Sequence, residues 1–105
     1  MATNRLDALK QMIAQDPGNT FARYGLAMEY SKNDLFEEAV SEFNRLLESD
    51  GTYVAAYYHG GQALEKLGRV EDARDFYERG IEACDRKGDA HTRSEIEAAL
   101  SLLPI

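Results

Sequence analysis

The chain has 105 residues, of which 12 are Lys or Arg and 19 are Asp or Glu, so its net charge is −7. This length suits one domain and excludes a large multidomain machine, while 44% hydrophobic residues are enough to build a core. The excess of negative charge repels phosphate backbones and anionic lipid headgroups, and this argues against nucleic acid and membrane surfaces as partners.

The start of the chain and its cysteine content bear on the compartment. Residues 1–5 do not begin the basic, apolar and small-residue pattern of a secretory signal. Cys84 is the single cysteine, so the chain can form no internal disulfide, as is usual in reducing compartments. We therefore expect a cytoplasmic protein.

Residues 3–16 are the first predicted helix. Three of its apolar residues stand 34 positions before three apolar residues further along the chain, pairing Leu9, Met12 and Ile13 with Phe43, Leu46 and Leu47. Repeated helical units show such a fixed offset. We interpret residues 3–16 as the second half of a repeat whose first half is absent.

Residues 20–53 are the first complete repeat. Asn19 is a suitable N-cap for a helix that begins at residue 20. A polar break at residues 32–34 separates two apolar stripes with helical spacing, which are Ala22, Leu26, Ala27, Tyr30 and then Phe36, Ala39, Val40, Phe43, Leu46, Leu47. This pattern predicts a hairpin of two antiparallel helices.

Residues 54–87 repeat the same pattern 34 positions later. Gly68 suits a left-handed helix end between the two helices of this second hairpin. Small residues at equivalent positions let paired helices approach closely, and large aromatic residues fill the gaps beside them. The small residues are Ala27, Ala39, Gly61 and Ala73, and the aromatic ones are Tyr30, Phe43 and Tyr77.

Residues 88–103 form the last predicted helix. Its apolar positions keep helical spacing, but they no longer align with the earlier units at an offset of 34. A stack of repeats needs terminal helices with a polar outer face. We therefore predict a capping helix here.

The spacing of these residues resembles the tetratricopeptide repeat family. That family's pattern is W-x2-L-G-x2-Y, then A-x3-F, then P. The first copy here reads Arg23-x2-Leu26-Ala27-x2-Tyr30, Ala39-x3-Phe43, Gly51, and the second reads Tyr57-x2-Gly60-Gly61-x2-Leu64, Ala73-x3-Tyr77, Asp85. The leading Trp is missing from both copies.

The resemblance implies an all-α fold. It would be a right-handed stack of antiparallel helical hairpins, with about two and a half repeats and a C-terminal capping helix, about six helices in all. Residues 1–105 would form a single domain, divided into the half repeat 3–16, repeats 20–53 and 54–87, and the cap 88–103.

The resemblance also implies that the first helices of successive repeats line a concave groove for a peptide or a helix of another protein. The matching positions carry Phe21, Tyr24, Met28, Tyr58, His59 and Gln62. This aromatic, mostly uncharged set suits peptide recognition. The alternative is that Tyr24 and Tyr58 pack internally against the neighbouring hairpin.

Some members of the family clamp a C-terminal carboxylate with Lys, Asn and Arg side chains. The corresponding places here hold Tyr24, Met28, His59, Asp89 and Arg93, so the clamp is not intact. We therefore do not expect recognition of an acidic C-terminus.

The sequence predicts no enzyme, cofactor or metal site. His59 and His91 have no His or Cys neighbour at metal-ligand spacing. Cys84 stands beside Asp85, a negative setting that raises the pKa of a thiol and disfavours a nucleophile. We expect a non-enzymatic protein-binding adaptor.

The alternative function is a self-associating structural module. Apolar residues of the terminal helices would then form a homodimer interface, through Leu9, Ile96, Leu100 and Leu103.

Overall fold

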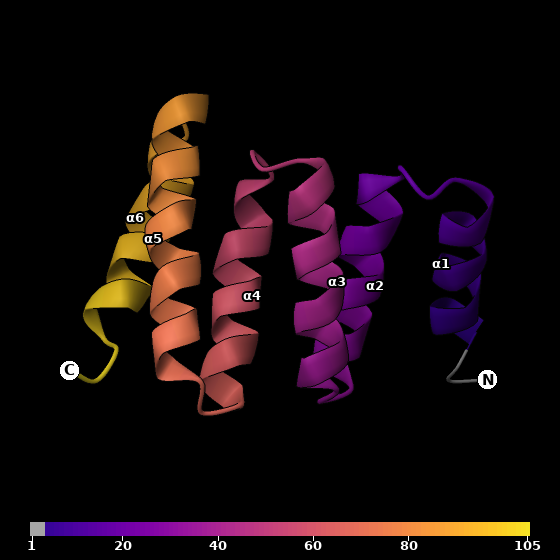
Figure 1. The fold of residues 1–105 in the computed structure, drawn as a ribbon, viewed down its shortest axis with the longest axis horizontal. Coiled ribbons are helices and arrows are strands. Elements are labelled where there is room, and N and C mark those ends of the chain that lie inside the picture. The colour runs from indigo at the N-terminus through magenta and orange to yellow at the C-terminus, as the bar shows by residue number, and fades with distance from the viewer. Residues whose placement is uncertain (1–3) are drawn as a thin grey trace.

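The computed structural model describes residues 4–105, which form six helices and contain no strand. The helices stand side by side in chain order, from α1 at one end of the stack to α6 at the other (Figure 1). Their bounds are α1 Asn4–Gln15, α2 Thr20–Lys32, α3 Phe36–Ser49, α4 Val54–Lys66, α5 Val70–Lys87 and α6 Ala90–Ser101. The predicted all-α stack of helical hairpins is confirmed, and no helix in this range is long and apolar enough to cross a membrane.

The two hairpins turn through equivalent residues. Asp34, between α2 and α3, has φ 62°, and Gly68, between α4 and α5, has φ 75°. In both turns the residue that follows donates its backbone N–H to a carbonyl oxygen of the preceding helix. Leu35 donates to Tyr30 O over 2.8 Å, and Arg69 donates to Leu64 O over 2.9 Å. Asp adopts a left-handed backbone more readily than most residues but at a higher cost than Gly, so the first turn is less favourable than the second.

Small residues allow the helices of a hairpin to approach closely. A Cβ atom at Gly61 of α4 would overlap the ring of Tyr77 of α5. Ala39 and Ala73 are completely buried, as are the large side chains Phe43 and Tyr77. The core is therefore filled by alternating small and large side chains, and there is little room for a larger residue at the small positions.

One contact between paired helices differs in chemistry between the repeats. In the first repeat, Arg23 of α2 donates to Glu42 of α3 over 2.7 Å, and both side chains are only 12% exposed. The equivalent residues 34 positions later are Tyr57 and Phe76, whose ring centroids lie 6.2 Å apart in an edge-to-face arrangement. An ion pair and an aromatic pair thus occupy the same place in the fold.

Helix α6 lies where the first helix of a further repeat would lie, because it packs against α5 and α4. It begins 36 residues after α4, not 34, since α5 has 18 residues where α3 has 14 and the following turn is shorter. The loss of alignment after Gly88 is therefore a shift of two residues. At an offset of 36, Leu100 corresponds to Leu64 and Ile96 to Gly60.

The burial of the terminal helices corrects the expected self-association surface. Leu9, Ile96 and Leu103 are buried within their own chain, and only Leu100 of the four is partly exposed. Leu9 lies against α2, where its side chain approaches Gly25, and Ile96 lies against Gly80 of α5. These three side chains complete the core and are not exposed for contact with a second copy.

Candidate functional site

The first helices α2 and α4 enclose a small pocket. It has a volume of about 130 Å³ and is lined by Met28, Ser31, Phe36, His59, Gln62, Ala63 and Lys66. Apolar atoms dominate its wall, and the hydroxyl of Ser31 is buried without a hydrogen-bond partner among the described residues. We call this the α2–α4 pocket.

A second, larger pocket lies between α4 and α6. It has a volume of about 440 Å³ and is lined by Tyr58, Gln62, Glu65, Glu95, Ala98, Ala99 and Leu102. We call this the α4–α6 pocket. Gln62 lines both pockets, so they adjoin, and we call the two pockets together the groove.

Four of the six residues predicted for peptide binding line this groove. Met28 and His59 line the α2–α4 pocket, Tyr58 lines the α4–α6 pocket, and Gln62 lines both. Phe21 lines neither pocket, although its side chain is 75% exposed. The groove therefore contains some, but not all, of the residues predicted to bind a peptide.

Tyr24 is partly buried, as is Tyr58, and it packs against the core. Its ring centroid lies 5.1 Å from that of Tyr53, 6.3 Å from that of Phe43 and 6.1 Å from that of His59. Burial raises the pKa of the Tyr24 hydroxyl, and the neighbouring Tyr53 adds to this rise. Tyr24 thus contacts His59 of the α2–α4 pocket without lining either pocket, whereas Tyr58 lines the α4–α6 pocket.

His59 stands between two aromatic rings at the junction of the helices. Its ring lies 5.2 Å from Tyr58 and 6.1 Å from Tyr24, in edge-to-face contacts. Burial lowers the pKa of His59, and this outweighs the opposing effects of Gln62 and Glu95. His59 is therefore a neutral, largely apolar part of the groove at neutral pH.

Glu65 and Glu95 bring negative charge to the α4–α6 pocket. The hydroxyl of Tyr77 donates to Glu65 Oε2 over 2.5 Å, which anchors one oxygen of that carboxylate. Burial, followed by this carboxylate, raises the pKa of Tyr77, so the hydroxyl keeps its proton. Glu95 contacts only His91 among charged partners in residues 4–105, at 4.0 Å. Both carboxylates can therefore accept a further donor.

The sequence interpretation missed the contribution of α6 to the groove. Glu95, Ala98 and Leu102 correspond to His59, Gln62 and Lys66 of α4 at an offset of 36. A search at 34 places other residues there, because two residues turn a helix by about 200°. The length of α5 was needed to align α6 with α4, and the sequence pattern did not reveal it. Phe36 was also missed, because it was assigned to the apolar stripe of α3 alone.

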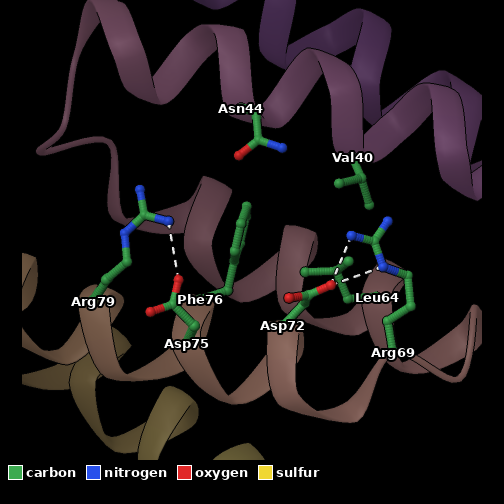
Figure 2. Close-up of a pocket in the computed structure, with 8 residues that line it drawn as sticks. All are labelled: Val40, Asn44, Leu64, Arg69, Asp72, Asp75, Phe76 and Arg79. Atoms are coloured by element: carbon green, nitrogen blue, oxygen red, sulfur yellow. Dashed lines mark hydrogen bonds and ion pairs between the residues drawn. The ribbon is translucent and has the colours of Figure 1, made fainter.

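A third pocket lies on the other helices of the hairpins, between α3 and α5 (Figure 2). Its charged side chains are paired with near neighbours, Arg69 with Asp72 at 2.6 Å and Arg79 with Asp75 at 3.3 Å. The guanidinium of Arg79 also lies 5.4 Å from the ring centroid of Phe76. These charges satisfy one another, so this pocket presents little that would select a ligand.

Cys84 and His91 lie in very different surroundings. Cys84 is buried in the core, and burial is the first cause that raises the pKa of its thiol, ahead of Asp89 and Asp85. The side chain of His91 is 88% exposed. Within residues 4–105, no group of three or more His, Cys, Asp or Glu side chains is arranged to hold a metal ion.

Known proteins share this fold and sequence pattern. A TPR repeat-containing protein of Pseudomonas aeruginosa is 28% identical over 98 residues, which cover 93% of each chain. The solution structure of a tetratricopeptide repeat domain protein from Salinibacter ruber is 41% identical, covers 82% of this chain and 87% of its own, and has a TM-score of 0.76. The TPR2B domain of yeast Sti1 in its complex with pHsp70 is 20% identical, covers 95% and 80%, and has a TM-score of 0.88.

The family model described as "Tetratricopeptide repeat" matches residues 22–53 and 54–91, which is more than half of the chain. These ranges cover the hairpins α2–α3 and α4–α5 except for the first two residues of α2. The chain therefore belongs to the tetratricopeptide repeat family.

Proposed function

We propose that this protein is a non-enzymatic interaction module that binds a peptide or helix of another protein in its groove. The observation that carries the proposal is that two adjoining pockets, lined by residues of α2, α4 and α6, share Gln62. Adjoining pockets in one groove suit consecutive side chains of a bound segment. An adaptor role in the cytoplasm is part of the same proposal.

The yeast Sti1 domain supports this proposal, because that relative in fold was solved in a complex with pHsp70. The groove here has its own chemistry. Uncharged Tyr24, Met28 and His59 stand where some family members carry the side chains that clamp a carboxylate. We therefore infer a partner segment other than an acidic C-terminus.

Blocking the shared wall of the two pockets tests the function. Gln62 is exposed and lines both pockets, so Gln62→Trp fills the groove without entering the core. Gln11→Trp is the matched control, because Gln11 is exposed on α1, away from the groove. A display library of random nine-residue peptides is selected against wild type and against both variants, each shown by circular dichroism to be helical.

We expect wild type and Gln11→Trp to enrich the same peptides and Gln62→Trp to lose them. If all three proteins enrich the same peptides, binding lies outside the groove. If wild type enriches none, the interaction function itself is wrong.

A homodimer is the second candidate function, and two exposed apolar side chains favour it. Phe21 on α2 is 75% exposed, and Met12 on α1 is 43% exposed. Sedimentation equilibrium should then show a dimer that becomes a monomer in Phe21→Glu. A wild-type monomer at high concentration would remove this candidate.

A further inference from the structure

We propose that the partner segment carries a Lys or Arg close to an apolar side chain, and that the groove binds the two in its two different pockets. This inference rests on the proposed function and names the chemistry of the ligand. The basic head group would lie between Glu65 and Glu95 in the α4–α6 pocket, and the apolar side chain would enter the α2–α4 pocket.

The α4–α6 pocket is negative, since the described residues that line it include Glu65 and Glu95 and no Lys or Arg. Glu65 and Glu95 come from two different helices and face the same depression. Neither forms an ion pair with Lys or Arg in residues 4–105, although one oxygen of Glu65 is held by the hydroxyl of Tyr77. A carboxylate that is positioned but not paired with a cation is available to a cation from outside.

The carboxylates of the pocket between α3 and α5 are paired, in contrast to Glu65 and Glu95. There, Asp72 pairs with Arg69, which caps the start of α5, and Asp75 pairs with Arg79 of α5. The net charge of −7 also favours the approach of a basic segment over an acidic one. Glu65 and Glu95 thus lie in a pocket that can receive a basic side chain of a bound segment.

Apolar atoms complete the α4–α6 pocket. Ala98 and Tyr58 form part of its wall, and Leu102 lies beside it with 84% of its surface exposed. The long apolar stems of Lys and Arg pack on such surfaces, while the charged head group stays in contact with water or polar groups. The volume of about 440 Å³ is large enough for a long side chain.

The adjoining α2–α4 pocket selects a different side chain. Its wall holds Met28, Phe36 and Ala63, and neutral His59 adds an aromatic edge. Lys66 lies at its rim and repels a second basic residue. Because the two pockets share Gln62, the apolar and the basic residue of the ligand must be within a few positions of each other.

The peptides enriched from the display library provide the first test. We expect Leu, Met or Phe with a Lys or Arg within about three positions, since alternate residues of an extended segment lie about 7 Å apart. Enriched peptides that depend on the groove but carry Asp or Glu, or no charge at all, would overturn the ligand chemistry and leave the interaction function standing. An absence of groove-dependent peptides would overturn both.

Charge removal provides the second test, with one enriched peptide carrying a fluorescent label as the probe. Glu65→Gln and Glu95→Gln should each weaken binding about two- to fivefold, as expected for exposed ion pairs, and more at low salt than at high salt. Gln at position 65 can still accept the hydrogen bond from Tyr77. Glu48→Gln is the matched control, because it removes the same charge from an exposed position on α3.

Substitution in the peptide completes the test. Replacing its Lys or Arg with Gln should weaken binding to wild type, but should change binding to the Glu65→Gln/Glu95→Gln double variant little. Equal losses in both proteins, or an effect of Glu48→Gln as large as that of Glu65→Gln, would show that the basic residue is not bound by these carboxylates.

Discussion

The two complete repeats solve the same packing problem with different chemistry. In the first, Arg23 and Glu42 form an ion pair, and Arg45 lies 3.6 Å from the same carboxylate. In the second, Tyr57 and Phe76 form an aromatic pair, and the guanidinium of Arg79 lies 5.5 Å from the ring centroid of Tyr57. The arginine at 45 and 79 is common to both.

This comparison shows that the fold requires complementary partners at this place and not a particular residue type. An aromatic pair stabilises the hairpin by burying apolar surface. A buried ion pair contributes little net stability, because the cost of removing two charges from water offsets their attraction. Removing one partner of such a pair is strongly destabilising, because the other charge is then buried without a partner.

The largest expected effects come from breaking each pair. Glu42→Ala should lower the free energy of unfolding by about 3 kcal/mol, since it leaves Arg23 nearly buried without its partner. Phe76→Ala should cost at least as much, about 3 to 5 kcal/mol, through lost burial and a cavity. Urea unfolding of both variants measures these values. Glu38→Ala, at an exposed position on α3, is the control and should change stability by less than about 0.5 kcal/mol.

Exchanging one pair for the other sharpens the comparison. The double variant Arg23→Tyr/Glu42→Phe places the aromatic pair of the second repeat in the first. We expect its stability to lie within about 1 kcal/mol of wild type or above it, because well-packed apolar residues often replace a buried ion pair without loss. A double variant as unstable as Glu42→Ala would show that the first repeat cannot accept the aromatic pair.

The hairpin turns differ in the same way, and smaller effects are expected there. Asp34→Gly should raise stability by up to about 1 kcal/mol, because it relieves a left-handed residue at φ 62°. Gly68→Ala should lower it by about 1 kcal/mol, since alanine is strained at φ 75°. Thermal unfolding of the two variants gives both shifts. Shifts of the same sign would contradict the equivalence of the two turns.

The smallest effect is a pH dependence confined to the second repeat. His59 occupies the position held by Gly25 in the first, and burial lowers its pKa in the folded state. The unfolded chain therefore binds a proton first as the pH falls below about 6.5, so stability declines there and levels off below the folded pKa. His59→Gln should reduce this decline between pH 7.5 and pH 5, measured by thermal unfolding.

The exposed His91 supplies the control for this measurement. His91→Gln should leave the difference between pH 7.5 and pH 5 as it is in wild type. If His59→Gln and His91→Gln behave alike, the acid sensitivity does not arise from the aromatic contacts of His59.

The helices and hairpins were predictable from the sequence because their signals are local. Asn19 caps α2 through a 3.0 Å bond to the Ala22 N–H, and Gly68 has the left-handed backbone that its position indicated. A cap or an apolar stripe depends on residues within one or two turns of the same helix. The site was predicted less completely, since Met28, Tyr58, His59 and Gln62 line the groove but Phe21 and Tyr24 do not.

The sequence by itself determined that this chain folds as stacked helical hairpins, because the 34-residue period and the small and aromatic positions recur in both repeats. Only the tertiary structure decided which side chains the groove presents. The extra length of α5 shifts α6 by two residues and brings Glu95 and Leu102 to the groove, while Tyr24 packs against neighbouring rings and lines neither pocket. The reason is physical: helical periodicity is set by near neighbours in the chain, whereas exposure depends on where separate helices lie in space.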